Sequence, residues 1–399
     1  MIKLLGNKSF FIIFLAAYAA LIFSYPHFLS ISSFEASIFY NDSGYLGIIT
    51  RFFCNIFGQN DFGLRIFFIA VYFASLPLFY SVSKRVLRQE SDARLSLLIF
   101  CLLPGSSLSA LLVMKSSVII FLSLAFIYLY GKGRTLLAFV MLGLSAVLDG
   151  AFAILFLSLI FYAIHKKDNA LIFVALLLFG LSMAMFGFDD GGRPRGYFLD
   201  TLGVYMSIFS PILFLYFVFA IYKIKREDRP IGWYVSFWAL IFSLLLSFRQ
   251  KIMIYDFAPF VVLAIPFMVK TFFASYRIRI GKNKRVYEVG FSVVLLSLAS
   301  VFVLSFFNRP LYACMDYKKT HFAYNYQVAK ELAQELKSLG ITECIVSDSD
   351  MAIRLKFYGI NRGGNYTVDE KPLKNSKKVS IIYSGVEVAS YYVTKINTL

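Results

Sequence analysis

Residues 64–82 read LRIFFIAVYFASLPLFYSV, and the chain continues with Ser-Lys-Arg-Val-Leu-Arg at 83–88. An apolar run of this length is typical of a helix that crosses a lipid bilayer. The same succession of apolar run and basic loop recurs along the chain, which is 59% hydrophobic with a mean hydropathy of +0.70. A soluble protein of 399 residues has no core large enough to bury so much apolar surface. We therefore predict an α-helical polytopic membrane protein.

The predicted spans are the apolar runs that approach the length of a transmembrane helix. There are about eleven such runs, each of roughly 17–25 residues or slightly fewer: 9–26, 64–82, 95–112, 116–131, 135–148, 150–164, 169–187, 201–223, 231–248, 255–273 and 289–307. Those between 95 and 164 are short and closely spaced, so two of them could be re-entrant or strongly tilted.

The loops between the spans alternate between basic and nearly neutral. If successive runs cross the bilayer, every basic cluster lies on one side, and the positive-inside bias places that side in the cytoplasm. The N-terminus, with Lys3 and Lys8, is then cytoplasmic, and the first run is an uncleaved span because no clean cleavage site follows it. The net charge of +17 accordingly reflects topology and contact with anionic membrane lipids, and it requires no nucleic-acid partner.

Two parts follow from the change in composition: a transmembrane part, residues 1–307, and a polar tail, residues 308–399. With an odd number of spans the tail is extracytoplasmic. The first external loop, 27–63, is long and too apolar to remain in water. Within it, residues 45–57 have helical spacing with an aromatic face, so we expect one or two helices that lie in the membrane interface.

The tail has the pattern of a small α/β domain. An apolar stripe predicts a helix at 326–339, with Asn325 as its N-cap and Gly340 as its stop. A short buried strand starts at Cys344. The remaining predicted elements are a helix at 351–357 and strands at 379–383 and 390–393.

The cysteines and histidines give one further prediction. Cys314 and Cys344 both lie in the tail, on the side predicted to be oxidising, so a disulfide between them is one interpretation. Two unlinked thiols, one of them in the core, are the alternative. No Cys or His spacing is typical of a zinc site, and no residue is assigned to a metal. A divalent cation held by carboxylates of the external face stays open.

Charged residues of both signs gather on the predicted external face. Asp149 and Asp256 each lie at the junction of two apolar runs, where a carboxylate is costly unless it faces a polar cavity or a partner. Acids with interleaved cations suit an anionic lipid head group with a proton acceptor beside it. For the loop at 189–195, a turn capped by solvated charges is the alternative to phosphate binding. The cations of this face are Arg51, Lys115, Arg193, Arg195, Arg249 and Lys251.

Several short stretches resemble the GT-C glycosyltransferases, in particular the bacterial aminoarabinose transferase and protein O-mannosyltransferase group. Phe-Gly-Gln-Asn-Asp-Phe-Gly-Leu-Arg at 57–65 resembles the family's Phe-Gly-x-Asn-Glu-x-x-x-Arg. Leu-Leu-Pro at 102–104 is similar to its Leu-x-Pro segment, and Lys-Ile-Met-Ile-Tyr at 251–255 to its Lys/Arg-x-x-x-Tyr stretch before a late span. The segment 331–358 looks like the small extracytoplasmic domain of many members, so the resemblance covers nearly the whole chain.

The resemblance implies an enzyme of the bacterial cytoplasmic membrane that takes a sugar from a polyprenyl-phosphate donor. It would transfer the sugar, on the external face, to a lipid, glycan or protein acceptor. Glu35 stands in the first external loop, where the family has its general base, with Asp42 as the alternative. Arg249 and Lys251 would neutralise the leaving phosphate, and Tyr255 would hold one of its oxygens.

The chain also departs from the family. Met-Lys-Ser-Ser at 114–117 lacks the Asp that members commonly have there, and Asp149-Gly150 replaces a common Lys-Gly. Either Lys115 and Asp149 have exchanged places in a rewired site, where they could keep a salt bridge across one cleft and serve in substrate binding, or catalysis has been lost.

Two other functions compete with the transferase. The first is a non-catalytic GT-C-like scaffold, assembly factor or chaperone with membrane-protein partners; the missing Asp at Ser116 favours it, whereas the retained Glu35 favours the enzyme. The second is a transporter of lipid-linked sugars. Ionisable residues near span ends and the lack of a visible sequence repeat argue against the transporter.

Overall fold

The apolar runs fold into helices in the computed structural model, which describes residues 7–187, 196–372 and 376–396. Packing divides the chain into two compact units. The first unit consists of Met1–Ala20, Phe68–Ala110 and Met114–Phe302. The second consists of Leu21–Phe67, Leu111–Val113 and Val303–Leu399, so it combines the first external loop with the tail.

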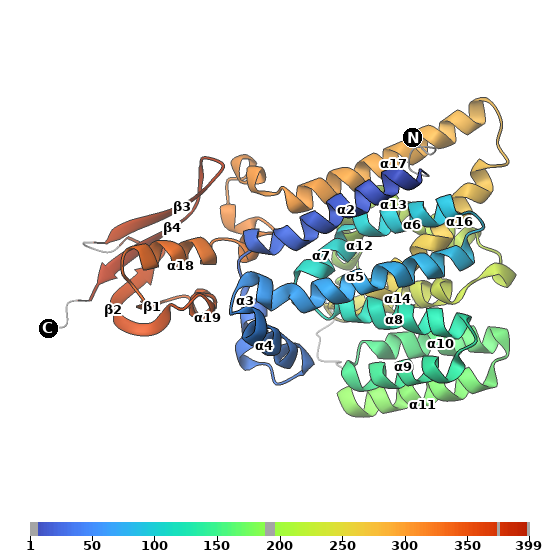
Figure 1. Ribbon diagram of the computed structural model, residues 1–399, viewed down its shortest axis with the longest axis horizontal. Coiled ribbons are helices and arrows are strands. Elements are labelled where there is room, and N and C mark those ends of the chain that lie inside the picture. The colour runs from blue at the N-terminus through green and yellow to red at the C-terminus, as the bar shows by residue number, and fades with distance from the viewer. Residues whose placement is uncertain (1–6, 188–195, 373–375, 397–399) are drawn as a thin grey trace. The chain divides into compact units, whose positions relative to one another are not determined.

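The first unit is built of helices (Figure 1). Three long helices have one end in this unit and the other in the second: α2 (Lys8–Ser24), α5 (Asp61–Val86) and α17 (Lys282–Phe306). The other helices of the first unit are α6 (Glu90–Leu102), α7 (Pro104–Leu111), α8 (Ser116–Gly131), α9 (Thr135–Leu148), α10 (Phe152–Lys166), α11 (Asn169–Phe186), α12 (Phe198–Phe209), α13 (Pro211–Lys223), α14 (Ile231–Ser247), α15 (Ala258–Val261) and α16 (Ile265–Tyr276).

Many of these helices have the length and composition of membrane spans. Among the described residues, five segments are long and apolar enough: Lys8–Phe28, Asp61–Val86, Asn169–Phe186, Ala258–Tyr276 and Asn283–Phe306. Two bent helix pairs raise this number to seven, and shorter apolar helices account for other predicted runs. The predicted class of helical membrane protein is confirmed. The count of about eleven spans, the boundary at residue 307 and the sidedness remain predictions.

Two segments predicted as single spans, 95–112 and 201–223, are broken. Helices α6 and α7 meet at a bend of 60°, and α12 and α13 at a bend of 103°. Pro104 and Pro211 each begin the second helix of their pair, and a proline disfavours helical geometry in the residue before it. At the second break Ser210 has φ 64°, which ends the preceding helix.

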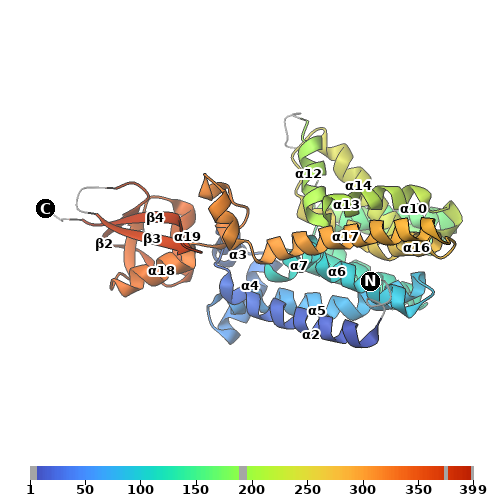
Figure 2. The ribbon, with the colours of Figure 1, turned by 90° about the horizontal axis from the view of Figure 1, so that it is seen from above.

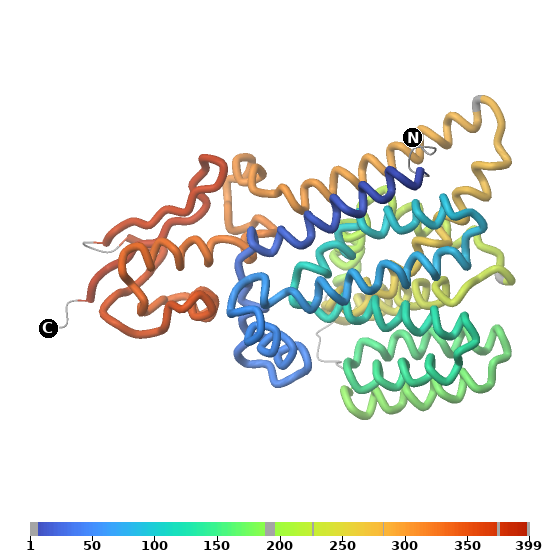
Figure 3. The backbone as a smooth tube through the Cα atoms, in the orientation of Figure 1, coloured from blue at the N-terminus to red at the C-terminus, as the bar shows by residue number. Residues whose placement is uncertain are grey.

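Within the first unit, α8 packs on α9, and α10 packs on both α11 and α14. Figure 1 shows α9, α10 and α11 as neighbouring, nearly parallel ribbons. Aromatic rings also stack between α10 and α14, where the ring centroids of Phe161 and Trp238 lie 3.9 Å apart. Figure 3 shows helix α2, in dark blue, running along the orange helix α17. The ring centroids of Tyr18 on α2 and Phe302 on α17 lie 6.1 Å apart.

The first external loop of the second unit contains two helices, α3 (Ser33–Asn41) and α4 (Tyr45–Phe57). Ser32 and Glu35 form a capping box at the start of α3. Helix α4 exposes Ile48, Phe52 and Ile56, each to 58%. The predicted helix at 45–57 is confirmed, whereas its position in the membrane interface remains a prediction.

The tail forms a four-stranded sheet with two helices on its core side. The strand order is β1-β2-β4-β3; β1 and β2 are parallel, and the other two pairs are antiparallel. Its core includes Leu332, Leu336, Val368, Val379 and Tyr391. The predicted α/β tail is confirmed. The elements are α18 (Ala329–Ser338), β1 (Glu343–Val346), α19 (Ser349–Phe357), β2 (Asn361–Asp369), β3 (Lys377–Tyr383) and β4 (Val386–Lys395).

Some details of the tail differ from the predictions. Asn325 is not the N-cap of α18, because residues 324–326 form a 3-10 turn and the helix begins after Val328, which has φ 76°. The helix does end before Gly340, whose φ is 74°. Strand β2 was not predicted at all.

The disulfide between Cys314 and Cys344, one of the two interpretations of the sequence, is not formed. All four cysteines of the chain are free. The side chain of Cys344 is buried in the core of the tail, whereas Cys314 is exposed at the end of a 3-10 helix, Arg309–Cys314. The alternative of two unlinked thiols, one of them a core residue, is the one observed.

Candidate functional sites

Three helix ends of the first unit bring together Lys115, Asp149, Tyr255 and Asp256, which we call the lysine cluster. Lys115 is the residue before α8, and Asp149 is the residue after α9. Tyr255 and Asp256 lie in the 3-10 turn that leads to α15. Since α8 packs on both α9 and α15, these polar residues meet where apolar helices begin and end.

The lysine is the centre of this cluster. Its Nζ lies 2.9 Å from Oδ1 of Asp149 and 2.6 Å from Oδ1 of Asp256. It also lies 5.5 Å from the ring centroid of Tyr255. The salt bridge anticipated between Lys115 and Asp149 is therefore present, and both carboxylates at the apolar junctions face the same cation.

The cluster is partly accessible and carries more negative than positive charge. The side chains of Lys115, Asp149 and Asp256 are 19%, 14% and 24% exposed. Burial alone would lower the pKa of Lys115, but Asp256 and Asp149 together raise the pKa above its ordinary value, so the lysine stays charged. Asp149 also accepts a hydrogen bond from the Ala151 N–H at 2.9 Å, which fixes its carboxylate. This arrangement suits a proton acceptor held in place by a lysine.

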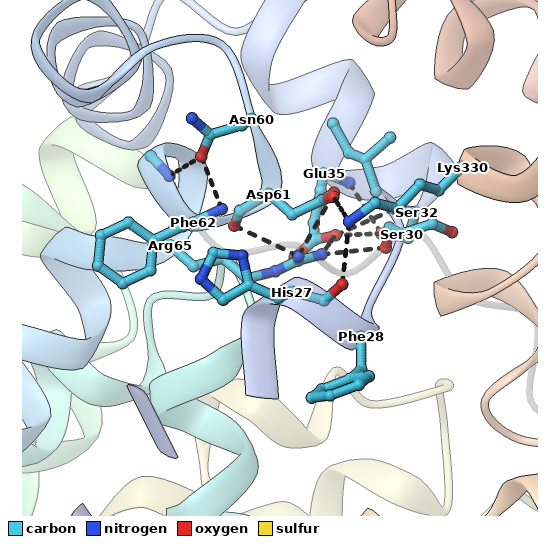
Figure 4. A network of polar contacts seen from close by, with 12 residues as sticks. His27, Phe28, Ser30, Ser32, Glu35, Asn60, Asp61, Phe62, Arg65 and Lys330 are labelled. Atoms are coloured by element: carbon cyan, nitrogen blue, oxygen red, sulfur yellow. Dashed lines mark hydrogen bonds and ion pairs between the residues drawn. The ribbon is translucent and has the colours of Figure 1, made fainter. Parts of the chain in front are cut away.

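A second polar cluster lies in the second unit; we call Glu35, Asp61, Arg65, Lys330 and Tyr358 the arginine network. Figure 4 shows Glu35, Asp61, Arg65 and Lys330. Arg65 Nη2 and Nε lie 2.7 and 3.2 Å from the two carboxylate oxygens of Glu35, a bidentate pair in which both side chains are at most 1% exposed. Because both charges are fully buried, removal of either side chain would leave the other charge buried without compensation.

Asp61 forms the other side of the network. Lys330 Nζ lies 2.8 Å from its Oδ2, and the Tyr358 hydroxyl donates to its Oδ1 at 2.5 Å. Arg65 Nη1 is 3.8 Å from the same Oδ1. Burial, and then the charge of Asp61, raise the pKa of Tyr358 well above its usual value, so this phenol remains a donor. The network thus joins the start of α5 to the tail.

Further donors saturate Glu35. Its Oε1 accepts from the Val113 N–H at 3.0 Å, and its Oε2 accepts from the N–H and the hydroxyl of Ser32 at 3.0 and 3.2 Å. With the two contacts from Arg65, the carboxylate is enclosed on all sides. This geometry holds the first external loop in place and leaves no free oxygen for an acceptor hydroxyl.

The other predicted site residues are distributed as follows. Asp42 accepts from the N–H groups of Gly44 and Gly47 at 2.8 and 3.3 Å and so caps α4. Arg249 and Lys251 are exposed between α14 and the turn that holds Tyr255. Arg193 and Arg195 lie outside the described residues.

Metal binding was left open by the sequence. Within residues 7–187, 196–372 and 376–396, no group of three or more His, Cys, Asp or Glu side chains has the geometry to hold a metal ion.

Sequence reasoning missed the arginine network. The signal was available, because Arg65 is a charged residue inside the apolar run 64–82, where an unpaired charge is costly. The rest of the network was not visible, since the fold of the tail brings Lys330 and Tyr358 to Asp61.

No protein-family model and no curated protein matches the chain. Solved structures do match it, among them crystal structures of ArnT from Cupriavidus metallidurans in the apo state and bound to undecaprenyl phosphate. The apo structure matches with a TM-score of 0.55 at 10% identity, over 97% of this chain and 98% of that one. The complex matches with a TM-score of 0.56 at 10% identity, over 98% and 99%. The resemblance to the GT-C aminoarabinose transferases is thereby confirmed at the level of the fold, which this chain shares over nearly its full length.

Proposed function

We propose that the chain is a membrane glycosyltransferase. It takes a sugar from a polyprenyl-phosphate donor and transfers it to a hydroxyl group of a lipid, glycan or protein acceptor at the external face of the bacterial cytoplasmic membrane. The observation that carries the proposal is the lysine cluster, a pair of partly exposed carboxylates held by one lysine in a chain with the ArnT fold. One of the matching ArnT structures is bound to undecaprenyl phosphate, which supports a polyprenyl phosphate as the lipid part of the donor.

The proposed reaction is a single displacement. The acceptor hydroxyl oxygen attacks the anomeric carbon of the donor sugar, and the bond from that carbon to the phosphate oxygen breaks. The hydroxyl proton passes to a carboxylate, and polyprenyl phosphate leaves. Such a step needs a base within hydrogen-bond reach of the hydroxyl and fixed positive charge near the phosphate.

We assign the base to Asp256, the most exposed charged side chain of the lysine cluster at 24%. Lys115 and Asp149 are positioning residues, since the lysine bridges the two carboxylates. The exposed Arg249 and Lys251, a few residues before Asp256, are the cations proposed for the leaving phosphate. Tyr255, whose ring centroid lies 5.5 Å from Lys115 Nζ, is the residue proposed to contact the donor.

Glu35 receives a different role from the one that the resemblance implies. Its oxygens are occupied by Arg65, Ser32 and Val113, so we propose that it orders the first external loop. The test of the base is therefore made at Asp256.

The experiment uses a deletion strain of the native host, complemented at equal expression with the wild type, Asp256→Asn or Asp200→Asn. Asp200 is an exposed carboxylate of the same unit and serves as the matched control. Mass spectrometry of envelope lipids, glycans and surface proteins should show one sugar lost from one acceptor in the deletion and in Asp256→Asn only. Full rescue by Asp256→Asn with wild-type glycosylation would remove Asp256 from the reaction.

One observation favours a second candidate, a non-catalytic scaffold or assembly factor. Both acids that the resemblance offered as bases, Glu35 and Asp42, are engaged in holding the backbone or a buried arginine. A scaffold predicts a deletion phenotype with no change in any sugar, and rescue by both Asp256→Asn and Lys115→Met.

A further inference from the structure

A large apolar cavity lies in the first unit, among helices α6, α13, α16 and α17. Its volume is about 620 Å³, within the range of small-molecule sites. Apolar side chains such as Leu95, Phe219, Phe272 and Phe291 line it, together with Gly290. Figure 2 shows α17 running alongside α16 and α13.

The length of the cavity corresponds to one leaflet of a membrane. Its lining residues on α17 extend from Val286 to Leu298, which is about 18 Å along a helix axis. The hydrocarbon of a single leaflet is about 15 Å thick. A hydrocarbon chain anchored at one membrane surface therefore fits the cavity along its length.

The cavity has a polar rim at one end, where two cations bind to residues of its lining. Lys223 Nζ donates to Oγ of Ser275 at 2.7 Å. Arg279 Nη2 donates to the hydroxyl of Tyr287 at 2.8 Å, and its guanidinium lies 4.0 Å from the centroid of that ring. Arg279 Nε is buried with no hydrogen-bond partner in the part of the chain that the structure describes.

The charges around this rim leave an excess of positive charge. Lys223 and Arg279 contact hydroxyl groups and aromatic rings, which are uncharged, so these contacts neutralise neither cation. Neighbouring Arg277 is paired with Asp92 at 2.7 Å, and Glu288 accepts from the Tyr276 hydroxyl at 2.5 Å. An anion at the rim would satisfy the two remaining cations and the unpartnered Nε.

We propose that this cavity binds one anionic glycerophospholipid of the surrounding membrane. An acyl chain would lie among α13, α16 and α17, with the phosphate between Lys223 and Arg279. The basic loops predict that this end faces the cytoplasm, where the leaflet is rich in anionic lipid. The site is independent of the proposed sugar transfer, because it shares no residue with the lysine cluster.

The test uses the purified full-length protein, reconstituted with equal amounts of phosphatidylglycerol and phosphatidylcholine and then delipidated stepwise under native mass spectrometry. Gly290→Leu should abolish the retained lipid, because a side chain added at Gly290 meets nothing within 4 Å and extends into the cavity. Gly180→Leu, on α11 and equally unobstructed, is the matched control and should retain the lipid.

The head-group half of the site is tested separately. Lys223→Gln and Arg279→Gln should each weaken phosphatidylglycerol retention about fivefold, the effect of one basic residue near an anionic surface. Arg134→Gln, an exposed cation of another predicted cytoplasmic loop, should leave retention unchanged. Equal retention of both lipids by the wild type, retention in Gly290→Leu, or displacement of phosphatidylglycerol by added polyprenyl phosphate at equal concentration would each overturn the proposal.

Discussion

A buried ion pair makes Glu35 a structural residue. Glu35 and Arg65 are both at most 1% exposed, so Glu35→Gln leaves the arginine charge uncompensated except by Asp61 at 3.8 Å. We expect a loss of about 3 kcal/mol in the free energy of unfolding, the lower end for breaking a buried pair. Denaturant unfolding of the purified protein measures this loss. Glu90→Gln, which removes the exposed partner of Lys84, is the control and should change little.

One result would assign Glu35 a role in catalysis after all. A Glu35→Gln protein with wild-type stability and no sugar transfer would mean that the carboxylate acts on the acceptor. In that case the enclosed geometry would have to open when substrate binds.

The burial of His321 predicts that the stability of the tail depends on pH. Its Nδ1 accepts from the Ala323 N–H at 3.1 Å, its ring stacks on Tyr312 at 4.2 Å, and burial lowers its pKa below the ordinary 6.5. The neutral form is therefore favoured in the folded state, so its stabilising contribution is complete above about pH 6.5 and is lost as the pH falls through the lowered pKa.

Hydrogen exchange of residues 309–330, measured between about pH 7.5 and about pH 5.5, roughly one unit on either side of the ordinary value, checks this prediction. Protection should fall on the acid side in the wild type and be less pH-dependent in His321→Gln. His165→Gln, in the first unit, is the control. Identical pH profiles for the wild type and His321→Gln would show that protonation of this imidazole does not affect the stability of the tail.

At the scale of elements, the hairpin between β3 and β4 has the backbone of a two-residue type I′ turn. Ser384 and Gly385 have φ of 50° and 78°, and Tyr383 pairs with Val386 across the turn. Nothing lies within 4 Å of a side chain added at Gly385, so Gly385→Ala tests the backbone alone. It should cost about 1–2 kcal/mol, whereas Ser384→Asn should stabilise the hairpin. Hydrogen exchange of the paired amides measures both; equal protection in the two variants would contradict the turn.

Elements with a strong local signal were predictable from sequence, and those set by distant contacts were not. Long apolar runs predicted the membrane helices, and the strands predicted at 379–383 and 390–393 fall within β3 and β4. Strand β2 begins with Asn-Arg-Gly-Gly, which is typical of a turn, and it forms only because β1 and β4 pair with it. The start of α18 depends on the positive φ of Val328, an unusual conformation for a β-branched residue.

The same division applies to the candidate site. Asp149 and Asp256 could be singled out because a carboxylate between apolar runs is costly without a partner. That both face Lys115 follows from the packing of α8 against α9 and α15, which no local pattern contains. The saturation of Glu35 likewise depends on Val113 and Arg65, which are distant in sequence.

At the scale of the whole molecule, the sidedness of the tail can be tested with its own thiol. Of the four cysteines, Cys314 is exposed and the other three are buried. A membrane-impermeant maleimide should therefore label the protein in intact spheroplasts, and Cys314→Ser should abolish that labelling. Labelling that appears only after the membrane is permeabilised would place the tail in the cytoplasm and reverse the predicted topology.

The most direct test of the central claim is sugar transfer by the purified protein. The wild type and Asp256→Asn are reconstituted in vesicles with the lipid-linked sugars and the acceptor fraction extracted from the deletion strain, and donor consumption and release of polyprenyl phosphate are followed by mass spectrometry. The wild type should convert donor to polyprenyl phosphate, and Asp256→Asn should be slower by about 10²–10⁴-fold, the usual contribution of a general base. No donor consumption by a wild-type preparation that still rescues the deletion strain would contradict the transferase and leave the scaffold.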